Sequence, residues 1–420
     1  MRIAMLSVHS SPLARLGGKE AGGMNVYIRE LSRELGRRGL AVDVFTRAQD
    51  ATTPPIVALD RGVRVISLRA GPAAPYDKNL LLDYLPEFIN RVRCFAESED
   101  LHYDVLHSHY WISGQVARAL RQAWGAPIVH MFHTLGSMKN EVARSDDERE
   151  TGGRIAIERD LLQSVDAVTA ATPLDRAQMV WHYGADAARI RVIPAGVDLQ
   201  RFQPRDRDAA RAALGLPAAP HRLVVLVGRI EPLKGIDALI EASAQLLAAR
   251  PALRGHYTAL VVGGEPEDAT ERWNAEQRRL GALRDALGLG DAVVFAGART
   301  HEELPLYYAA ADIVTMPSHY ESFGMAALEG LASGRPVVAT DAGGPAFIVE
   351  DGISGLLTPP AAPDRLAGQL GRILDDDALA ALLAAGARQR ARRFGWPTIG
   401  CEIMQVYRDV LHGARPAVAV

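Results

Sequence analysis

The alternation of short apolar runs, rich in β-branched residues, with amphipathic segments constrains the fold more than any other feature of this sequence. In residues 25–38, for example, apolar side chains recur at helical spacing on one face: Tyr27, Ile28, Leu31 and Leu35. Apolar strands interleaved with helices are typical of a parallel sheet covered on both faces. The pattern therefore predicts an α/β fold with doubly wound sheets.

The pattern occurs twice along the 420 residues, which predicts two Rossmann-like domains. The expected strands of the first half are Ile3–Val8, Ala41–Thr46, Val63–Leu68, Val105–His107, Ile128–Phe132, Ala167–Ala170 and Ile190–Pro194. Those of the second are Leu223–Val227, Ala259–Val262, Val293–Ala296, Ile313–Met316, Val337–Ala339 and Gly355–Leu357. We expect domains at residues 1–198 and 199–396, and a closing helix and tail at 397–420 after the break at Trp396-Pro397. Doubly wound domains bind ligands at the carboxyl ends of their strands, so the two are expected to face each other across a cleft.

Composition excludes several classes of function. The formal net charge of -3 gives no reason to expect a nucleic-acid partner. The two cysteines, Cys94 and Cys401, are far apart and make neither a disulfide framework nor a zinc site, which fits a reducing cytoplasm. The apolar run at residues 1–9 is too short for a signal peptide, and no run approaches the ~18 apolar residues of a membrane span. We therefore expect a cytoplasmic enzyme without a membrane span.

Lysine is scarce in this chain. Four of the 47 Lys and Arg residues are lysines: Lys19, Lys78, Lys139 and Lys234. Most positions that accept either residue thus carry Arg, and a remaining lysine is a candidate for a place that needs a compact point charge. Chance is the alternative for each of them.

Two loops are candidates for binding phosphate. Gly17–Gly23 lies between the first strand and a helix expected from Met24, and its glycines would let backbone amides approach an oxyanion. It is neither a dinucleotide fingerprint nor a Walker loop, and a plain connection is the alternative. In the second half Arg229 ends a strand and Lys234 precedes a helix. Two cations there could neutralise a departing diphosphate, with a surface turn as the alternative.

The segment Ser318–Gly330 follows the expected strand Ile313–Met316, and its helix is expected to begin near Phe323. Backbone amides at a helix N-terminus are ready to bind phosphate. Glu321 lies just before the helix and Glu329 about two turns along it, so both would lie near one side at different depths. One carboxylate could bind the hydroxyls of a sugar and the other those of a ribose; the alternative is a helix cap and a solvated side chain.

Taken together, these motifs resemble the GT-B retaining glycosyltransferases of family 4 over nearly the whole chain, including Ala342–Pro345 and Gly352–Leu357. The resemblance implies a nucleotide-sugar donor, a UDP-sugar above all, and a C-terminal helix that closes back. It implies that Arg229 and Lys234 hold the diphosphate, Glu321 the transferred sugar and Glu329 the ribose. Further donor contacts implied by the resemblance are Gly23, Arg299, Ser322, Phe323, Gly324, Met325 and Gly344.

His133 follows the expected strand Ile128–Phe132 in the context His-Thr-Leu-Gly. A histidine in the core would be the default interpretation, but in similar enzymes this residue lies beside the sugar ring, and its carbonyl stabilises positive charge at the anomeric carbon. His107 and His109 lack cysteine or carboxylate partners at metal-ligand spacing. We interpret them as strand-end residues near the acceptor.

The first half is similar to one branch of the family, the inositol-phosphate glycosyltransferases of mycothiol synthesis, as Gly22–Tyr27 shows. The resemblance implies an acceptor site at Asn25, Lys78, Tyr110, Thr134 and Arg154. A lysine, an arginine and two hydroxyls suffice to hold a phosphomonoester. Sucrose-phosphate synthases resemble the same regions and also bind a phosphorylated acceptor. Glu141–Gly153 departs from the branch, because it is charged, lacks the expected proline and ends in two glycines.

The expected function is retaining transfer of a sugar from UDP-GlcNAc or UDP-glucose to a small phosphorylated acceptor such as inositol phosphate. No Asp-x-Asp motif follows a strand, since Asp146-Asp147 and Asp375–Asp377 lie in charged segments, so we expect no metal site and no obligatory cofactor. The alternatives are transfer to fructose 6-phosphate, a UDP-GlcNAc 2-epimerase, a non-catalytic sugar-nucleotide binder and a lipid glycosyltransferase, although no basic, aromatic-rich helix favours the last. A homodimer remains open.

Overall fold

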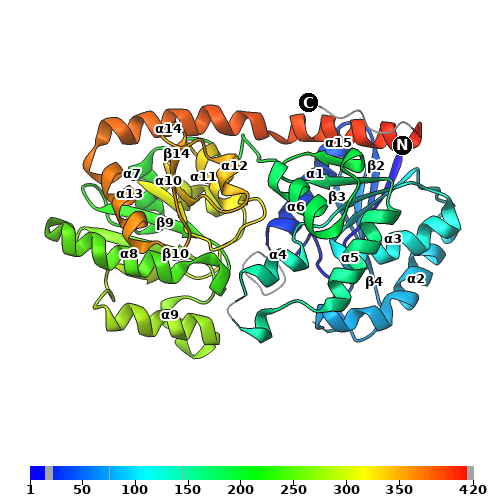
Figure 1. The fold of residues 1–420 in the computed structure, drawn as a ribbon, viewed down its shortest axis with the longest axis horizontal. Helices are drawn as coiled ribbons and strands as arrows, with labels where there is room; N and C mark the ends of the chain where they lie inside the picture. The colour runs from blue at the N-terminus through cyan, green and yellow to red at the C-terminus, as the bar shows by residue number, and fades with distance from the viewer. Residues whose placement is uncertain (15–21, 75, 144, 414–420) are drawn as a thin grey trace. The chain divides into compact units, whose positions relative to one another are not determined.

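The computed structural model describes residues 1–14, 22–74, 76–143 and 145–413. The chain divides into two compact units (Figure 1). Unit 1 comprises residues 1–14, 23–196 and the C-terminal segment from Trp396, and unit 2 comprises Val197–Gly395 with Gly22. The C-terminal helix α15 (Trp396–Leu411) therefore belongs to unit 1 rather than forming a separate part.

Unit 1 contains an eight-stranded sheet in the order β3-β4-β2-β1-β5-β6-β7-β8. Its strands are β1 (Arg2–Leu6), β2 (Ala41–Arg47), β3 (Ile56–Asp60), β4 (Val63–Leu68), β5 (Val105–His109), β6 (Ile128–Met131), β7 (Ala167–Ala170) and β8 (Ile190–Val192). All neighbours are parallel except β3, which pairs antiparallel with β4 at the edge. Because β1 pairs with both β2 and β5, the strand order reverses at β1/β5.

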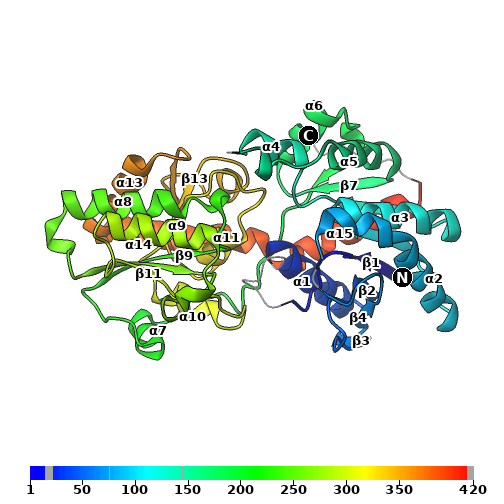
Figure 2. The ribbon, with the colours of Figure 1, turned by 90° about the horizontal axis from the view of Figure 1, so that it is seen from below.

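Helices cover both faces of this sheet. On one face α1 and α15 pack against each other, and Arg38 donates a hydrogen bond of 2.6 Å to the carbonyl of Pro397. On the other, α3 packs against α2 and α5 (Figure 2). The helices of unit 1, with short 3-10 turns labelled η, are α1 (Gly23–Arg37), η1 (Lys78–Tyr84), α2 (Leu85–Ser98), α3 (Tyr110–Trp124), α4 (Gly136–Glu141), η2 (Asp146–Glu148), α5 (Gly152–Ser164), α6 (Pro173–Tyr183), η3 (Ala187–Arg189) and α15.

Unit 2 contains a six-stranded, wholly parallel sheet in the order β11-β10-β9-β12-β13-β14. Its strands are β9 (Arg222–Val227), β10 (Tyr257–Val262), β11 (Val293–Phe295), β12 (Ile313–Met316), β13 (Val337–Thr340) and β14 (Gly355–Thr358). In order of appearance this is the arrangement 3-2-1-4-5-6 of a dinucleotide-binding fold, which reverses at β9/β12.

Around the second sheet α8 packs against α13 and α9, while α7 pairs with α10 and α11 with α14. The helices and turns of unit 2 are α7 (Arg207–Leu214), η4 (Pro232–Lys234), α8 (Ile236–Ala249), η5 (Pro251–Leu253), η6 (Glu267–Arg272), α9 (Ala275–Ala286), α10 (Leu304–Ala310), α11 (Met325–Ala332), α12 (Pro345–Ile348), α13 (Pro363–Asp375), α14 (Asp377–Ala391) and η7 (Arg392–Phe394).

The predicted fold class is confirmed, and each of the thirteen predicted strands overlaps a strand of the structure. The central strands β5, β6, β7, β10, β12 and β13 are buried along their whole length, as a sheet covered on both faces requires. The edge strand β3, which is half exposed, was not predicted. The start of α11 was predicted near Phe323, whereas Gly324 adopts φ of 101° and the helix begins at Met325. Among the described helices none is both long and apolar enough to cross a bilayer.

Candidate functional site

The strand order gives each unit one place where loops from two neighbouring strands diverge, and such switch points are where open α/β sheets bind ligands. In unit 1 this is the carboxyl end of β1 and β5, and in unit 2 the carboxyl end of β9 and β12. Arg229 and Lys234 follow β9, and Glu321, Ser322 and Phe323 follow β12, while other residues expected to bind ligands lie in helices or after neighbouring strands. We describe each unit by itself.

In unit 1 the predicted phosphate-binding residues come together around Arg154, whose side chain is buried. Its Nη1 donates to the hydroxyl of Tyr110 at 2.9 Å. Its Nη2 donates to the carbonyl and hydroxyl oxygens of Thr134 at 2.8 and 3.2 Å. The Lys78 Nζ lies 5.7 Å from the centre of the Tyr110 ring, within the range of a cation–π contact. The structure thus brings these four residues together, and their role in binding an acceptor stays a prediction.

A second lysine completes this cluster, and a carboxylate lies at its centre. Lys78 Nζ lies 3.3 Å from Glu150 Oε1, and Lys139 Nζ lies 2.5 Å from the same oxygen. Arg154 Nη1 approaches that oxygen to 2.8 Å. We call Lys78, Tyr110, Thr134, Lys139 and Arg154 the cationic cup. Burial alone would raise the pKa of Glu150, but Arg154, Lys139 and Lys78 outweigh it and lower that pKa to about 2.

The local sequence fixes the geometry of the cup. Thr151 caps α5, since its Oγ1 accepts from the backbone N–H of Arg154 at 3.2 Å, which places Arg154 in the first turn of that helix. The Nε of Arg154 donates to the buried Glu158 at 2.7 Å, and the hydroxyl of Tyr183 donates to the same carboxylate. Burial would lower the pKa of Arg154, yet Tyr110, Glu158 and Glu150 together raise it. A buried charge needs such partners, and they keep the guanidinium ionised.

The two glycines that end the charged segment, Gly152 and Gly153, could have loosened this side of the cup, but both lie in the first turn of α5, which Thr151 caps. Lys139, Glu150 and Glu158 were not predicted as site residues. The scarcity of lysine in the chain had marked Lys139 as a candidate for a position that needs a point charge. The two glutamates had none, because nothing local distinguishes a buried glutamate from the many exposed ones.

His9, in the loop after β1, is a further residue of this site that the sequence did not indicate. Its ring lies 4.4 Å from the ring of Tyr110, and its Nδ1 is buried without a hydrogen-bond partner in the described part of the chain. Burial, with smaller contributions from Lys78 and Arg154, lowers the pKa of His9 to about 3. His9 is therefore neutral at pH 7 and offers one unused ring nitrogen beside the cup.

Two of the strand ends at this site are strained. Tyr110 follows β5 with φ of 73° and His133 follows β6 with φ of 62°, a left-handed conformation that non-glycine residues rarely adopt. Such strain is stored at functional sites when the surrounding packing enforces it. His133 Nε2 lies 3.0 Å from Nδ1 of His109, and burial, followed by neighbouring histidines, holds the pKa of His133 well below its usual range. His133 thus presents a neutral ring at the end of β6.

The remaining predicted residues of unit 1 have partners within the unit. Asn25 is buried and donates to Ser10 Oγ and the Ser11 carbonyl, both at 2.6 Å, so its amide fixes the loop after β1. His107, expected near the acceptor, bonds through Nδ1 to the Tyr407 hydroxyl of α15 at 2.7 Å and belongs to the core. Gly23 is the first residue of α1, and residues 17–21 of the glycine-rich loop lie outside the described residues.

In unit 2 the structure brings Lys234 and Glu321 into direct contact, with Nζ 2.5 Å from Oε2. Lys234 ends η4 after β9, and Glu321 lies in the loop after β12. Gly235, with φ of 62°, allows this approach, because a Cβ there would lie 2.0 Å from the carbonyl oxygen of Pro317. Both side chains are one-fifth exposed and therefore accessible to a ligand.

The loop after β13 holds the Glu321 segment in place. Gly344 donates its backbone N–H to the carbonyl of Glu321 at 2.7 Å. A Cβ on Gly344 would come within 2.2 Å of the Cα and the carbonyl oxygen of Phe323, so only glycine permits this packing. The Gly-Gly-Pro motif noted in the sequence therefore positions Glu321 and Phe323, which lie shortly before α11.

The N-terminus of α11 is open to an anion. Gly324 provides no side-chain cap, and Met325 begins the helix. The hydroxyl of Ser322 is buried and has no hydrogen-bond partner among the described residues. Phe323 packs edge-on against Phe394 with 6.4 Å between ring centres, which gives this turn an apolar support.

Glu329 lies in the second turn of α11 and is buried rather than solvated. Its Oε2 accepts from the Tyr308 hydroxyl at 2.8 Å, and its Oε1 lies 2.9 Å from His301 Nε2. Arg201 donates to Nδ1 of His301 at 2.6 Å, so Nδ1 is the acceptor and Nε2 donates to the carboxylate. These residues, missed by the sequence analysis, fix Glu329 as an acceptor in one orientation.

The two predicted arginines of unit 2 lie at the carboxyl ends of β9 and β11. Arg229 Nη1 pairs with Glu231 at 2.7 Å and is more than one-third exposed. Arg299 follows β11, where its Nε donates to the hydroxyl of Tyr307. Both therefore border the same edge of the sheet as Lys234, as expected from sequence.

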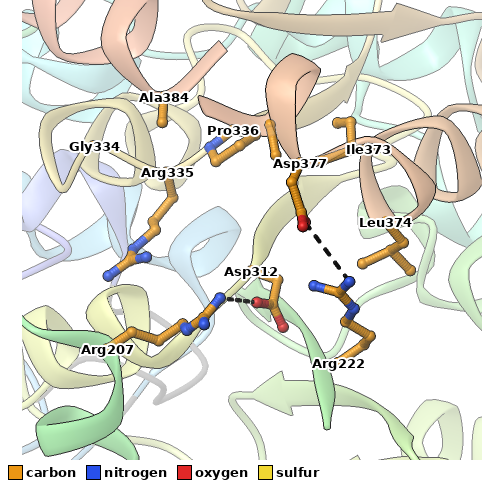
Figure 3. A pocket seen from close by; sticks show the side chains of 11 residues that line it. Arg207, Arg222, Asp312, Gly334, Arg335, Pro336, Ile373, Leu374, Asp377 and Ala384 are labelled. Carbon is orange, nitrogen blue, oxygen red and sulfur yellow. Dashed lines mark hydrogen bonds and ion pairs between the residues drawn. The ribbon is translucent and has the colours of Figure 1, made fainter. Parts of the chain in front are cut away.

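A separate pocket lies at the opposite, amino ends of β9, β12 and β13 (Figure 3). Asp312 pairs there with Arg207 at 2.6 Å and with the buried Arg211 at 2.7 Å, and it accepts from the backbone N–H of Leu223. Arg222 and Asp377, which also line the pocket, pair with each other at 3.7 Å. These bonds tie α7 to the first and fourth strands, and the pocket is remote in the fold from the strand ends described above.

The family description "Glycosyl transferase 4-like domain" matches residues 22–196, and "Glycosyl transferases group 1" matches residues 206–390. The D-inositol 3-phosphate glycosyltransferase of Acidothermus cellulolyticus is 43% identical over 417 residues, 99% of this chain and 92% of that protein. That of Geodermatophilus obscurus is 44% identical over 396 residues, 94% of this chain and 86% of its own.

Solved structures are similar over the whole chain. A sucrose-phosphate synthase of Thermosynechococcus elongatus superimposes with a TM-score of 0.89 at 36% identity, covering 98% of this chain and 100% of that one. The Anabaena protein HepE, solved with UDP and glucose, has a TM-score of 0.76 at 23% identity over 97% and 100% of the two chains, which shows the shared fold.

Proposed function

Because this chain belongs to the group 1 glycosyltransferases with a glycosyltransferase 4-like amino-terminal domain, we propose that it transfers a sugar from a UDP-sugar to a small phosphorylated acceptor, with retention of configuration. Inositol phosphate is the acceptor that the names of its relatives favour. The observation that carries the proposal is the cationic cup, in which Lys78, Lys139 and Arg154 converge on one point.

The chemistry of the cup supports an acceptor that carries phosphate. Its two ammonium groups and one guanidinium supply charge-assisted donors, and the hydroxyls of Tyr110 and Thr134 lie against the guanidinium. A phosphate could accept from all of these donors, whereas a neutral sugar would leave them paired with Glu150. The neutral ring of His9 next to the cup suits the hydroxyl groups of a polyol.

In unit 2 the same reasoning supports the donor. Arg229 and Lys234 would bind the diphosphate, and the open N-terminus of α11, with the unpartnered Ser322 hydroxyl, would take a phosphate oxygen. Glu321 would bind the transferred sugar, and Glu329, fixed by His301 and Tyr308, the ribose hydroxyls. The neutral His133 would lie beside the sugar ring. A hydroxyl of the acceptor would attack the anomeric carbon of the donor sugar from the same face from which UDP leaves. An oxygen of the leaving phosphate would take the proton of that hydroxyl.

The test is a matrix of donors and acceptors, with product mass as the readout. UDP-GlcNAc, UDP-glucose and GDP-mannose are each combined with inositol phosphate, fructose 6-phosphate and their unphosphorylated counterparts. We expect product from a UDP-sugar and a phosphorylated acceptor only. Equal turnover of inositol and inositol phosphate would contradict the role given to the cup.

Transfer to fructose 6-phosphate is the second candidate, because the structural similarity to a sucrose-phosphate synthase extends over the whole chain. The same matrix separates the two acceptors. An epimerase would convert UDP-GlcNAc without any acceptor, and release of ManNAc would reveal it. A non-catalytic binder would retain UDP affinity but turn over nothing, and a lipid glycosyltransferase would require an acceptor in vesicles.

A further inference from the structure

Glu150 occupies the position in the cationic cup that an anionic ligand would take. We propose that its carboxylate is a built-in substitute for the phosphate of the acceptor, and that a phosphorylated acceptor binds by displacing it. This inference rests on the proposed function, since it concerns the same cup. It makes Glu150 a specificity-determining residue that selects acceptors carrying a dianionic group.

Three cationic groups converge on a single oxygen of Glu150. Lys78 Nζ, Lys139 Nζ and Arg154 Nη1 all lie within 3.3 Å of one oxygen, Oε1 of Glu150. An ordinary surface carboxylate binds one cation, whereas three donors converging on one oxygen is the arrangement that a phosphate oxygen receives. The carboxylate is almost fully buried and lies next to the N-terminus of α5, which also favours a negative charge.

The balance of charge in the cup favours a dianionic ligand. Lys78, Lys139 and Arg154 are positive, and the charged groups facing them are Glu150 and Glu158 in the described part of the chain. Glu158 is fixed by Arg154, Gly136 and Tyr183 and stays in place. When Glu150 leaves, two positive charges are in excess, which matches the charge of about -1.5 to -2 of a phosphomonoester at pH 7. A ligand with a single negative charge would only replace the carboxylate of Glu150 by an equal charge and would gain little binding free energy.

The carboxylate of Glu150 can leave the cup without movement of its backbone. Asn140 binds the backbone of Glu150 in both directions, as its Oδ1 accepts from the N–H at 2.7 Å and its Nδ2 donates to the carbonyl at 3.2 Å. The backbone is therefore held, and the side chain can rotate out about its own bonds.

The first experiment measures binding of inorganic phosphate by calorimetry at low ionic strength, with full-length wild type, Glu150→Gln and Asp146→Asn. Asp146 is a fully exposed carboxylate of the same segment and serves as the matched control. We expect Glu150→Gln to bind phosphate about tenfold more tightly or better, since a competing charge-assisted pair is removed, and the control to bind as wild type does. Unchanged or weaker binding by a folded Glu150→Gln protein would overturn the proposal.

The second experiment needs no variant and decides the matter if Glu150→Gln does not fold. Wild-type protein is labelled at carboxylates with a carbodiimide and an amine, with and without inorganic phosphate, and the labelled residues are read by mass spectrometry. We expect labelling of Glu150 to rise with phosphate relative to Asp146, whose labelling reports consumption of the reagent. If phosphate leaves Glu150 as protected as before, the substitution does not occur.

The proposed function and the role of Glu150 as a substitute anion can be refuted independently. If Glu150→Gln binds phosphate more tightly but turnover ignores the acceptor phosphate, the proposed function is wrong and the substitute anion stands. If turnover requires the phosphate but Glu150→Gln gains no phosphate affinity, the acceptor class stands and Glu150 only holds the cations together.

Discussion

Gly344→Ala is the most informative single substitution in unit 2, because it adds one methyl group against the backbone that carries Glu321. The new Cβ would lie 2.2 Å from the Cα and the carbonyl oxygen of Phe323, whereas ordinary contact begins at 3.4 Å. The loop must therefore shift by about 1.2 Å, and the hydrogen bond from Gly344 to Glu321 is lost or stretched. A shift of this size in a positioning loop is expected to lower kcat/KM by about 100-fold.

The assay compares kcat/KM for sugar transfer and the unfolding free energy of wild type, Gly344→Ala and Gly368→Ala. Overpacking at Gly344 is expected to cost about 1–3 kcal/mol of stability, so the variant remains folded. Gly368 lies in α13, where an added Cβ would meet open space, and its substitution by Ala should be neutral or slightly stabilising. If Gly344→Ala keeps activity within about threefold of wild type, the loop after β13 does not position the site.

Four further outcomes follow from the contacts. Lys78→Met should raise KM for a phosphorylated acceptor by about 10–100-fold and leave KM for the donor unchanged, as steady-state kinetics would detect. Tyr308→Phe leaves one oxygen of Glu329 without its donor and should cost about 1–3 kcal/mol in urea unfolding, with a weaker affinity for UDP. Asp312→Ala removes the partner of the buried Arg211 and should destabilise unit 2 by about 3–5 kcal/mol in the same assay. The unfolding free energy of unit 1 should fall as the pH drops below 6.5, because histidines of the unfolded chain bind protons that the buried histidines of the folded chain do not. Burial lowers the pKa of His9, His107 and His130 to about 3, so each should cost about 1.4 kcal/mol at pH 5.5. Unfolding measured at pH 7.5 and at pH 5.5 checks this loss.

The fold was readable from sequence because its signals are local. A buried parallel strand such as Ile313–Met316 is a continuous apolar run, and the residue that follows it lies at the carboxyl edge of the sheet. This rule placed Arg229, His133 and Glu321 at the correct edge. The edge strand β3 escaped it, because a strand paired on one side and half exposed carries no such run.

The partners of the site residues were not readable, because they are brought together by tertiary structure. Glu329 is held by His301 and Tyr308, which are 28 and 21 residues away. Glu158 compensates Arg154 from the next turn of the same helix, yet the spacing alone is that of many exposed ion pairs. Only burial distinguishes this ion pair from an exposed one, and burial depends on the whole fold.

Both units neutralise their lysines with a carboxylate of their own. Lys78 and Lys139 bind Glu150 in unit 1, and Lys234 binds Glu321 in unit 2, which accounts for every described lysine of the chain. An anion that enters either site must replace an existing ion pair, so its net affinity is the difference between two charge-assisted contacts rather than the full energy of one. This arrangement orients the ammonium groups in advance and weakens binding of small monoanions. Sites of this kind favour ligands that bring more charge, or more donors and acceptors, than a single carboxylate, as a diphosphate and a phosphomonoester both do.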